Sequence, residues 1–570
     1  MLSPVALPDV RFTDERLLSA QGRNAEYLRY LDLDRLLYAY RLAAGLPTPG
    51  ESSGGWEAPG SPDRGNFLGH YLSACAQTFA ASGDELLRDR GVAAAAELAK
   101  CQDAIGTGYV QAQPAEKLDL LERGERLDWV GPYYAVHKLM AGLLDVHLLC
   151  GDERAADVLL GLVEYVRGRC DRLSDRELDA VLQREFGGMS EVLHNVYALT
   201  GDHAHLALAH RFDHASFLGP LALEHDNLAG LHANTQVPKI LGAARHYELT
   251  GDPLYRAAVR FFWDLVAGPR TYATGGTSDD EHWRDPRKLT GTLGSKNQES
   301  CVTHNMLKVT RYLLRWTGHA RYGDYHERAF WNSVVGTQHP GTGMFAYFLP
   351  LGPGGAKAYS TPYDSFWCCM GTGVEAFARL TDGIYFHGRD EVLVNMIVAS
   401  EARIPMLGVA LTQQTRFPEE AATRVVITTA PRSELTLRVR VPHWAQQPTL
   451  TVNGTAVAPC QPGTIAGVRR RWRAGDTLRL ETPMSLRLEP LPDELDTAAI
   501  VFGPLVLAAQ TPTTPMALAG VGDDVGAWVR QCGDGRLRFQ ADTASGILAL
   551  RPLNQVVEEP YSVYWSVGAT

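Results

Sequence analysis

The 570-residue sequence predicts an α+β multidomain protein, with paired helices in its first two thirds and antiparallel β-sandwich domains after them. Three observations support this prediction. Apolar residues recur at i, i+3 and i+4 spacing as far as about residue 382, and they alternate with polar residues in short segments from about residue 383. The chain is also too long for a single domain, because a domain usually holds about 100 to 200 residues.

Helical spacing is clearest in a series of runs from the N-terminal third onward: 24–42, 66–80, 134–149, 156–168, 190–199, 239–249, 254–266, 306–316 and 325–336. Gly-Asp pairs separate several of them, at 83–84, 151–152, 201–202 and 251–252, and Gly318 is a variant. Glycine suits the left-handed C-cap of one helix, and aspartate suits the N-cap of the next. The pattern predicts serial helical hairpins. Repetition alone does not decide whether they close into an (α/α)6 ring or form an open solenoid.

The strand-like segments favour two β-sandwich units. Segments 391–398, 423–429, 435–444, 449–457 and 477–482 alternate, and Asn453-Gly454 is expected to form a hairpin turn. A second break near 488–496 precedes the apolar segment 498–509 and a last strand within 562–567. We therefore predict four parts, listed from the N-terminus: an extension over 1–23 that offers a strand to the β region, a helical domain over 24–382, and β-sandwich domains over 383–490 and 491–570.

Composition excludes several classes of partner. The net charge of −11 argues against nucleic acid and anionic membranes, and 45 % hydrophobic with 21 % charged residues is ordinary for a soluble protein. The N-terminus has no basic and apolar leader, so the sequence as given predicts a cytoplasmic protein. Nine cysteines, an odd number, favour free thiols or metal ligands over a disulfide framework. Four of them lie in apolar helical runs and are expected to be core thiols: Cys75, Cys101, Cys150 and Cys170.

The tandem pair Cys368-Cys369 has three interpretations: a vicinal disulfide, two unrelated core thiols, or two ligands of one soft metal. Adjacent strand residues point to opposite faces, so both thiols reach one ion only in a turn, which the following MGTG is expected to supply. Glu299 and Cys301 would share a face if their segment were extended. Three thiolates and a carboxylate suit Zn²⁺. The residues alone leave a metal site and core cysteines both open.

Other polar residues have a structural and a functional interpretation. The Asp279-Asp280-Glu281 loop is either a solvated acidic turn or, beside Trp283, the source of a general acid. His304 is expected to pack beside a site and not to bind metal. Polar residues that do not fit an apolar helix would together line the mouth of a helical ring: His70, His137, Glu185, Glu191, His232, Asn234 and Gln236. Aromatic side chains suited to stacking on sugars are Tyr133, Tyr134, Trp283, Tyr347 and Trp367.

The order of GGTS with Glu281, then ESC, then a tyrosine in FAYFLPL and finally WCC before a helix resembles the β-L-arabinofuranosidases of glycoside hydrolase families 127 and 146. The resemblance runs over about 24–382. It implies an (α/α)6 barrel that holds Zn²⁺ through one glutamate and three cysteines, with one cysteine as nucleophile. Carried over, the ligands are Glu299, Cys301, Cys368 and Cys369. Cys368 is then the nucleophile and Glu281 the acid/base, and the furanose is contacted by His137, His232 and Tyr347.

The sequence departs from family 127 at one position. Where its members have a further sugar-contacting histidine, this chain has Gly187-Gly188, and Glu185 is the candidate for that role, with His70 as another residue at the mouth. The resemblance implies a retaining exo-acting enzyme that removes terminal β-L-arabinofuranosyl residues from plant glycans. Two alternatives stay open: the same site acting on a different terminal sugar, and a zinc-stapled glycan-binding protein without catalysis.

The expected partner is a carbohydrate, with neither nucleic acid nor membrane. The β domains have three candidate roles that their strands do not separate: binding carbohydrate, packing against the barrel, or forming a homodimer.

Overall fold

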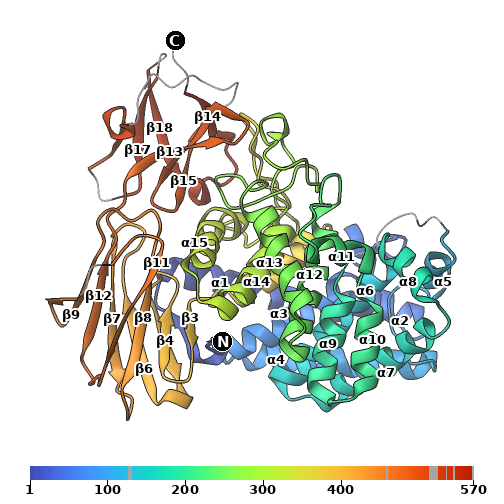
Figure 1. The fold of residues 1–570 in the computed structure, drawn as a ribbon. Coiled ribbons are helices and arrows are strands. Elements are labelled where there is room, and N and C mark those ends of the chain that lie inside the picture. Colours follow the sequence, from blue (N-terminus) through green and yellow to red (C-terminus); the bar gives the residue numbers. More distant parts are fainter. Residues whose placement is uncertain are drawn as a thin grey trace.

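A computed structural model describes residues 1–125, 127, 131–185, 187–457, 460–511, 524–533, 536–543 and 546–567. The helices gather on one side of the molecule and the β sheets stand beside them, as Figure 1 shows. The helices are α1 (Glu15–Tyr30), α2 (Leu33–Ala43), α3 (Phe67–Ser82), α4 (Glu85–Ile105), α5 (Glu116–Glu122), α6 (Pro132–Cys150), α7 (Glu153–Cys170), α8 (Asp175–Leu182), α9 (Met189–Thr200), α10 (His203–Arg211), α11 (Ala215–Ala222), α12 (Ala233–Thr250), α13 (Pro253–Ala267), α14 (Ser300–Thr317), α15 (Ala320–Ala329) and α16 (Cys368–Ala378).

The helices close into a ring. Helix α3 packs on α6, α6 on α9, α9 on α12, α12 on α14, α14 on α16, and α16 returns to α3. Each of these inner helices has an outer partner, and the sixth pair joins α16 to α1, the first helix of the chain. The ring decides between the two arrangements that repetition left open, and the (α/α)6 barrel is confirmed.

The Gly-Asp breaks act as predicted. Gly83, Gly151, Gly201 and Gly251 each end a helix in the left-handed region, with φ between 68° and 79°. The aspartate after each glycine caps the next helix; the carboxylate of Asp152, for example, accepts the backbone N–H of Ala155 at 2.8 Å. Because these breaks reverse the chain, the inner helices all run in the same direction and present their N-terminal ends at one end of the barrel.

The first β unit contains two sheets, with strand orders β1-β3-β4-β8-β11 and β10-β9-β12-β7-β6-β5-β2. Neighbouring strands are antiparallel except β4 and β8, which are parallel. The hairpin turn at Asn453-Gly454 is present, with φ of 51° and 81°. The strands are β1 (Ser3–Pro4), β2 (Val10–Phe12), β3 (Tyr385–His387), β4 (Glu391–Val394), β5 (Ser400–Ile404), β6 (Val409–Gln414), β7 (Ala422–Thr429), β8 (Leu435–Val441), β9 (Thr449–Val452), β10 (Thr455–Ala456), β11 (Thr464–Arg470) and β12 (Thr477–Glu481).

The second β unit has one sheet path, β13-β14-β15-β18-β17-β16, with β19 paired to β15 and β20 to β14. Its strands are β13 (Leu486–Leu491), β14 (Glu494–Phe502), β15 (Leu505–Gln510), β16 (Val529–Gln531), β17 (Phe539–Thr543), β18 (Gly546–Pro552), β19 (Tyr561–Ser562) and β20 (Tyr564–Ser566). Strands β1 and β2 from the N-terminus pair with β3 and β5 in the first unit. The exact domain boundaries stay a prediction.

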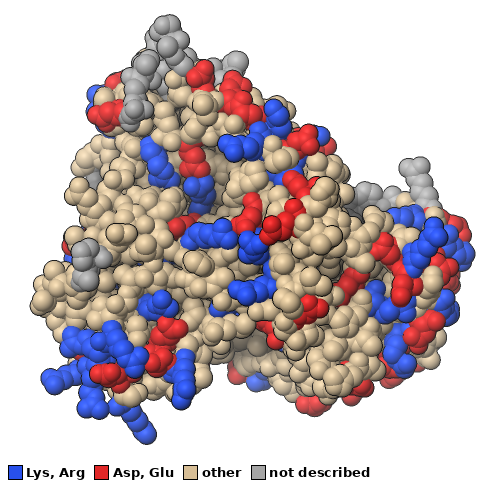
Figure 2. Space-filling view, viewed as in Figure 1, with Lys and Arg blue, Asp and Glu red and all other residues tan. Residues whose placement is uncertain are grey.

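Positive and negative side chains are interspersed over the face of the helical domain in Figure 2, and a group of Lys and Arg gathers at one end of the first β unit. Within the described ranges, none of the helices combines the length and the apolar character that a membrane crossing requires.

A buried ion-pair network joins the barrel to the first β unit. The guanidinium of Arg440, on β8, is fully buried and contacts Asp324 Oδ1 at 2.7 Å and Glu327 Oε1 at 2.6 Å, both on α15. Its Nε donates to the carbonyl of Asn395 at 2.7 Å. The indole of Trp444 donates to the second oxygen of Glu327 at 2.8 Å. Packing against the barrel is therefore one role of the β region.

Replacing Arg440 with methionine is expected to lower the free energy of unfolding by about 3 to 5 kcal/mol, because two carboxylates stay buried without their cation. Equilibrium urea unfolding measures the change. Arg438→Met, on the same strand, is the matched control: Arg438 pairs with Glu391 at 3.0 Å near the surface, and such a pair contributes about 0 to 1 kcal/mol. Equal losses in the two variants would contradict the role of the buried network.

Candidate active site

Four side chains from two helix N-termini meet at one end of the barrel. Glu299 is the N-cap of α14 and Cys301 lies in its first turn. Cys368 and Cys369 are the first two residues of α16. The N-terminal end of a helix carries partial positive charge, so both helices favour negative charge on these groups. All four are buried, and Cys368 has the largest exposed fraction, 7 %.

Two local predictions about these residues are wrong. Glu299 and Cys301 do not share a face of an extended segment, since they flank the start of a helix. The MGTG sequence is not a turn either, because it lies inside α16. Its glycines make room for neighbours: a Cβ on Gly371 would lie 2.3 Å from the ring of His70, and one on Gly373 would lie 2.4 Å from Phe345. Close packing, not a turn, explains the glycines.

The four ligand atoms lie within 4.8 Å of one another. The Sγ of Cys369 is 3.2 Å from Cys301 Sγ and 3.9 Å from Cys368 Sγ. Glu299 Oε1 is 3.7 Å from Cys369 Sγ and 3.8 Å from Cys368 Sγ. Ligands held at about 2.0 to 2.3 Å in a tetrahedron lie about 3.5 to 3.8 Å apart, so the spacing matches one metal ion.

One oxygen atom among these four side chains also lacks a hydrogen-bond partner in the described part of the chain. The second carboxylate oxygen of Glu299, Oε2, is buried and has no hydrogen-bond partner among the described residues. Burial raises the pKa of Glu299, and it also raises the pKa values of Cys301 and Cys369. Hydrogen bonds from Cys301 and Cys369 instead hold the pKa of Cys368 well below its usual range. A cluster of buried acidic groups with an orphaned oxygen is what a metal cation would neutralise, so these residues fit a metal ion.

A carboxylate stands beside the thiols. The hydroxyl of Tyr347 donates to Glu281 Oε1 and lies 3.5 Å from Cys368 Sγ. His232 Nε2 lies 3.0 Å from the other oxygen of Glu281. Because His232 Nδ1 accepts the backbone N–H of Thr235 at 3.3 Å, the ring proton is on Nε2 and is donated to Glu281. Burial raises the pKa of Tyr347 far above its usual value, so this phenol keeps its proton.

The backbone around the site is strained. Glu281 has φ of 66°, and Gln298 and Phe366, which precede the two ligand segments, have φ of 56° and 53°. Non-glycine residues rarely adopt this left-handed region, and such conformations concentrate at functional sites. Hydrogen bonds from neighbouring segments stabilise this conformation at Glu281: the backbone N–H of Ala233 donates to the carbonyl of Glu281 at 2.7 Å.

Two further predicted site residues, His137 and His70, are both buried. The ring of His137 packs edge-on against Tyr134, with 5.3 Å between centroids, and Tyr134 itself packs with the cysteines. A Cβ on Gly188 would lie 2.4 Å from His137 Nε2, so glycine there makes room for this histidine. His70 is buried, and its Nδ1 lies 2.5 Å from Glu375 Oε1.

Glu185 is fully buried, and both of its carboxylate oxygens accept hydrogen bonds. Its two carboxylate oxygens accept the backbone N–H groups of Tyr133 at 3.0 Å and Tyr134 at 3.2 Å, at the start of α6. A Cβ on Gly131 would lie only 1.8 Å from this carboxylate. Glu185 therefore caps α6, and its contact with a substrate stays a prediction.

Two residues that contact the cysteine cluster were not predicted from the sequence, Thr372 and Trp56. The hydroxyl of Thr372 donates to Cys301 Sγ at 3.0 Å. Trp56, from a short 3-10 helix (Gly55–Glu57) more than 300 residues upstream of Cys368, packs with the thiol cluster together with Trp367 and Tyr347. Thr372 sits one helical turn after Cys368, and this i+4 spacing was a usable signal. No local pattern marks Trp56.

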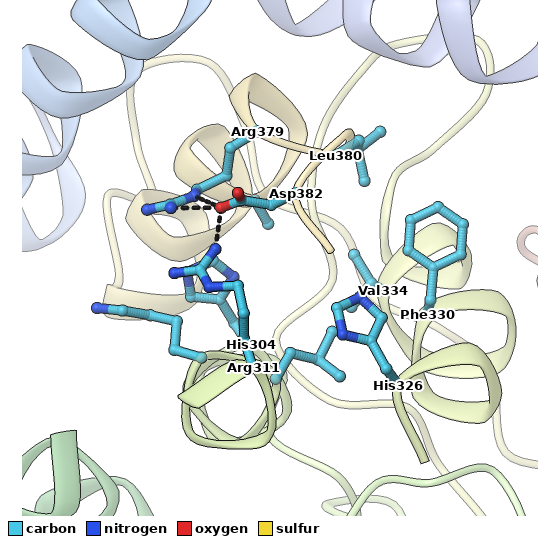
Figure 3. Close-up of a pocket in the computed structure, with 11 residues that line it drawn as sticks. His304, Arg311, His326, Phe330, Val334, Arg379, Leu380 and Asp382 are labelled. Atoms are coloured by element: carbon cyan, nitrogen blue, oxygen red, sulfur yellow. Dashed lines mark hydrogen bonds and ion pairs between the residues drawn. The ribbon is translucent and has the colours of Figure 1, made fainter. Parts of the chain in front are cut away.

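A small cavity of about 40 Å³ lies further along α14 and α16, shown in Figure 3. His304 is among its lining residues and is not part of the metal-binding group. Asp382 pairs with both Arg311 and Arg379 there, as the dashed lines in Figure 3 mark. The charges of these three side chains are thus engaged with one another, and the cavity is a packing feature of the barrel.

The closed ring of helices, with a carboxylate and buried thiols at its polar end and β-sandwich units behind it, defines a class of enzyme, a glycoside hydrolase built on an (α/α)6 barrel. The chain belongs to the β-L-arabinofuranosidase family GH127. The catalytic-domain model of that family matches residues 9–382, and the middle-domain model matches residues 391–484.

Solved structures agree in fold. A GH127 β-L-arabinofuranosidase from Geobacillus stearothermophilus T6 has a TM-score of 0.79 at 17 % identity, covering 98 % of this chain and 100 % of that one. A GH127 β-arabinofuranosidase has a TM-score of 0.76 at 17 % identity, covering 100 % and 98 %. A further glycoside hydrolase has a TM-score of 0.70 at 16 % identity, again covering 100 % and 98 %. Comparison with the curated proteins finds no match.

Proposed function

We propose that this glycoside hydrolase is a retaining exo-β-L-arabinofuranosidase, with Cys368 as nucleophile, Glu281 as acid/base and Zn²⁺ held by Glu299, Cys301, Cys368 and Cys369. One observation carries the proposal: the Tyr347 hydroxyl contacts both the thiol of Cys368 and the carboxylate of Glu281. The two groups are therefore no more than two hydrogen-bond lengths apart. Retaining glycosidases hold their two reactive groups about 5 to 5.5 Å apart, and inverting ones keep them further apart.

The same hydroxyl supplies a route for one proton. When the thiol of Cys368 donates to Tyr347 and Tyr347 donates to Glu281, a shift of both protons leaves a thiolate that accepts from Tyr347 and a carboxylic acid on Glu281. This is the charge state that the first step requires. The proton on His232 Nε2 meanwhile fixes the other oxygen of Glu281.

In the first step the thiolate of Cys368 attacks the anomeric carbon, a C–S bond forms, and the glycosidic C–O bond breaks as Glu281 protonates the leaving oxygen. In the second step Glu281 takes a proton from water, the water oxygen attacks the same carbon, and the C–S bond breaks to restore the thiolate. Two displacements return the original configuration. The bound metal would supply Lewis acidity that holds its cysteine ligands as thiolates at neutral pH.

The pocket residues support a small, neutral sugar. His232, the N-cap of α12, contacts Glu281, and His137 in α6 packs on Tyr134 beside the cysteines. Trp56 and Trp367 add apolar surface beside Cys368. Aromatic and imidazole groups bind sugar faces and hydroxyls without a net charge. The terminal β-L-arabinofuranosyl group of plant glycans is the substrate that the family supports best. A different terminal sugar at the same site is the second candidate.

We expect the reduced enzyme to release L-arabinose from an aryl β-L-arabinofuranoside, and a strong chelator to abolish release. Without the metal, burial keeps the protons on Glu299, Cys301 and Cys369, and the cation that would hold the cysteine ligands together as thiolates is lost. Liberated sugar and bound zinc are both measured, and added Zn²⁺ restores both together. Release from other aryl pentosides but not from this one would identify the second candidate. Full activity in metal-free protein would contradict the role of the metal.

A further inference from the structure

A second group of metal-ligating side chains lies outside the active site. It contains His210 at the end of α10, Asp213 in the following loop and His246 in the last turns of α12. The cysteine cluster lies at the N-terminal ends of the inner helices, whereas His246 lies toward the C-terminal end of one of them. The reaction proposed above uses none of these three residues.

The spacing within the group is that of ligands around one ion. Asp213 Oδ2 lies 3.3 Å from His210 Nδ1 and 3.6 Å from His246 Nδ1. All three ligand atoms lie within 4.8 Å of one another. Nitrogen and oxygen ligands held at about 2.0 to 2.1 Å in a tetrahedron lie about 3.3 Å apart. The group therefore needs little movement to close on a metal ion.

An unpartnered nitrogen points to a missing ligand. His246 has an exposed fraction of only 2 %, and its Nδ1 has no hydrogen-bond partner among the described residues, although it faces the carboxylate of Asp213. A buried imidazole nitrogen left without a partner is costly, and native structures rarely keep one. A metal ion bound between Nδ1 and the carboxylate would give this nitrogen a partner.

The surrounding side chains fix the carboxylate as they do around known metal ligands. The hydroxyl of Tyr255 donates to Asp213 Oδ2 at 2.7 Å, and the hydroxyl of Ser190 donates to Oδ1 at 3.0 Å. The ring of Tyr255 also stacks on His246, with 3.6 Å between centroids and 11° between planes. Such outer contacts orient ligands and are typical of metal centres.

We propose that His210, Asp213 and His246 form a second Zn²⁺ site, independent of the proposed catalysis, which joins α10 to α12. Two imidazoles and one carboxylate are a donor set that Zn²⁺ binds. A cavity of about 210 Å³ lies beside Asp213 and Tyr255, with otherwise apolar lining. The site would link the outer helix α10 to the inner helix α12 and stabilise the barrel wall.

The test compares His210→Ala with His203→Ala in the full-length, untagged chain. Both histidines are exposed and lie on α10, but His203 is outside the group, so neither substitution opens a hole in the core. After equilibration with Zn²⁺ and removal of loosely bound ions, we expect His210→Ala to retain one zinc fewer per chain than the wild type. His203→Ala should retain the wild-type amount. Equal zinc contents in all three proteins would overturn the proposal.

Cobalt separates this site from the cysteine cluster. Co²⁺ bound by thiolates gives intense sulfur-to-metal charge-transfer absorption, whereas Co²⁺ bound by nitrogen and oxygen gives only weaker d–d bands. The difference spectrum between wild type and His210→Ala should contain d–d bands alone, and Asp213→Asn should reproduce it. A difference spectrum with thiolate bands, or none at all, would refute the site. Neither result depends on whether the cysteines bind metal or catalyse hydrolysis.

Discussion

Replacing Cys368 with serine is expected to lower kcat/KM by on the order of 10⁴-fold or more, since loss of a covalent nucleophile removes most of the catalysed rate. The serine hydroxyl occupies nearly the same position but is far less acidic than a thiol, so Tyr347 and Glu281 cannot draw off its proton. Steady-state hydrolysis of an aryl β-L-arabinofuranoside measures the loss, with zinc content and folding checked on the same preparation.

Cys532→Ser is the matched control. Cys532 is partly exposed in the second β unit and is far from the site in sequence, so its loss should leave kcat/KM unchanged within about twofold. The assignment of the nucleophile would be wrong if the Cys368 variant, folded and loaded with zinc, kept activity near that of the wild type. A trapped sugar on Cys368, detected by mass spectrometry after a rapid quench, is the positive counterpart.

Glu281→Gln is expected to lower turnover of a natural linkage by roughly 10² to 10⁴-fold, the usual contribution of a positioned general acid. The amide has nearly the same shape as the carboxylate and still contacts Tyr347 and His232, but it cannot donate a proton to the leaving group. An aryl glycoside with a good leaving group needs no protonation, so its first step should be affected much less. Pre-steady-state release of the phenol separates this first step from the second.

Asp280→Asn is the control for the loop. Asp280 also has positive φ, is exposed and pairs with Lys296 at 2.9 Å, so its loss tests disturbance of the strained backbone alone. We expect turnover within about twofold of the wild type. Azide needs no general base, and it should restore turnover of the aryl substrate in Glu281→Gln. Equal losses on activated and natural substrates, without rescue by azide, would argue against the acid/base role.

Local signals predicted local structure well. The left-handed glycines and capping aspartates depend only on neighbouring residues, and they fall where the Gly-Asp pairs indicated. Closure of the ring could not be predicted in this way, because α16 contacts α3, which lies almost 300 residues earlier in the chain, and α1, which lies more than 330 residues earlier. No periodicity reports such contacts. The resemblance to a family supplied that information.

At the site, residue types were more predictable than geometry. Glu299, Cys301, Cys368 and Cys369 come together as one group, but the sequence placed them on an extended segment and in a turn. A helix was expected after the tandem cysteines, but the cysteines themselves begin it, and Gly371 and Gly373 hid this because they look like helix breakers. Tertiary packing explains the two glycines, because the rings of His70 and Phe345 occupy the space where a Cβ would be.

The pairing of α1 with α16 sets the order in which the chain can fold during synthesis. Helix α1 leaves the ribosome early, but its partner and the two tandem cysteines follow only after more than 330 further residues. Strand β2 waits longer still, since β5 begins at Ser400. The ring therefore stays open until its last inner helix emerges, and the thiol of Cys301 meets the tandem cysteines only then. Contacts of such long range make closure the slow, entropically costly step of assembly.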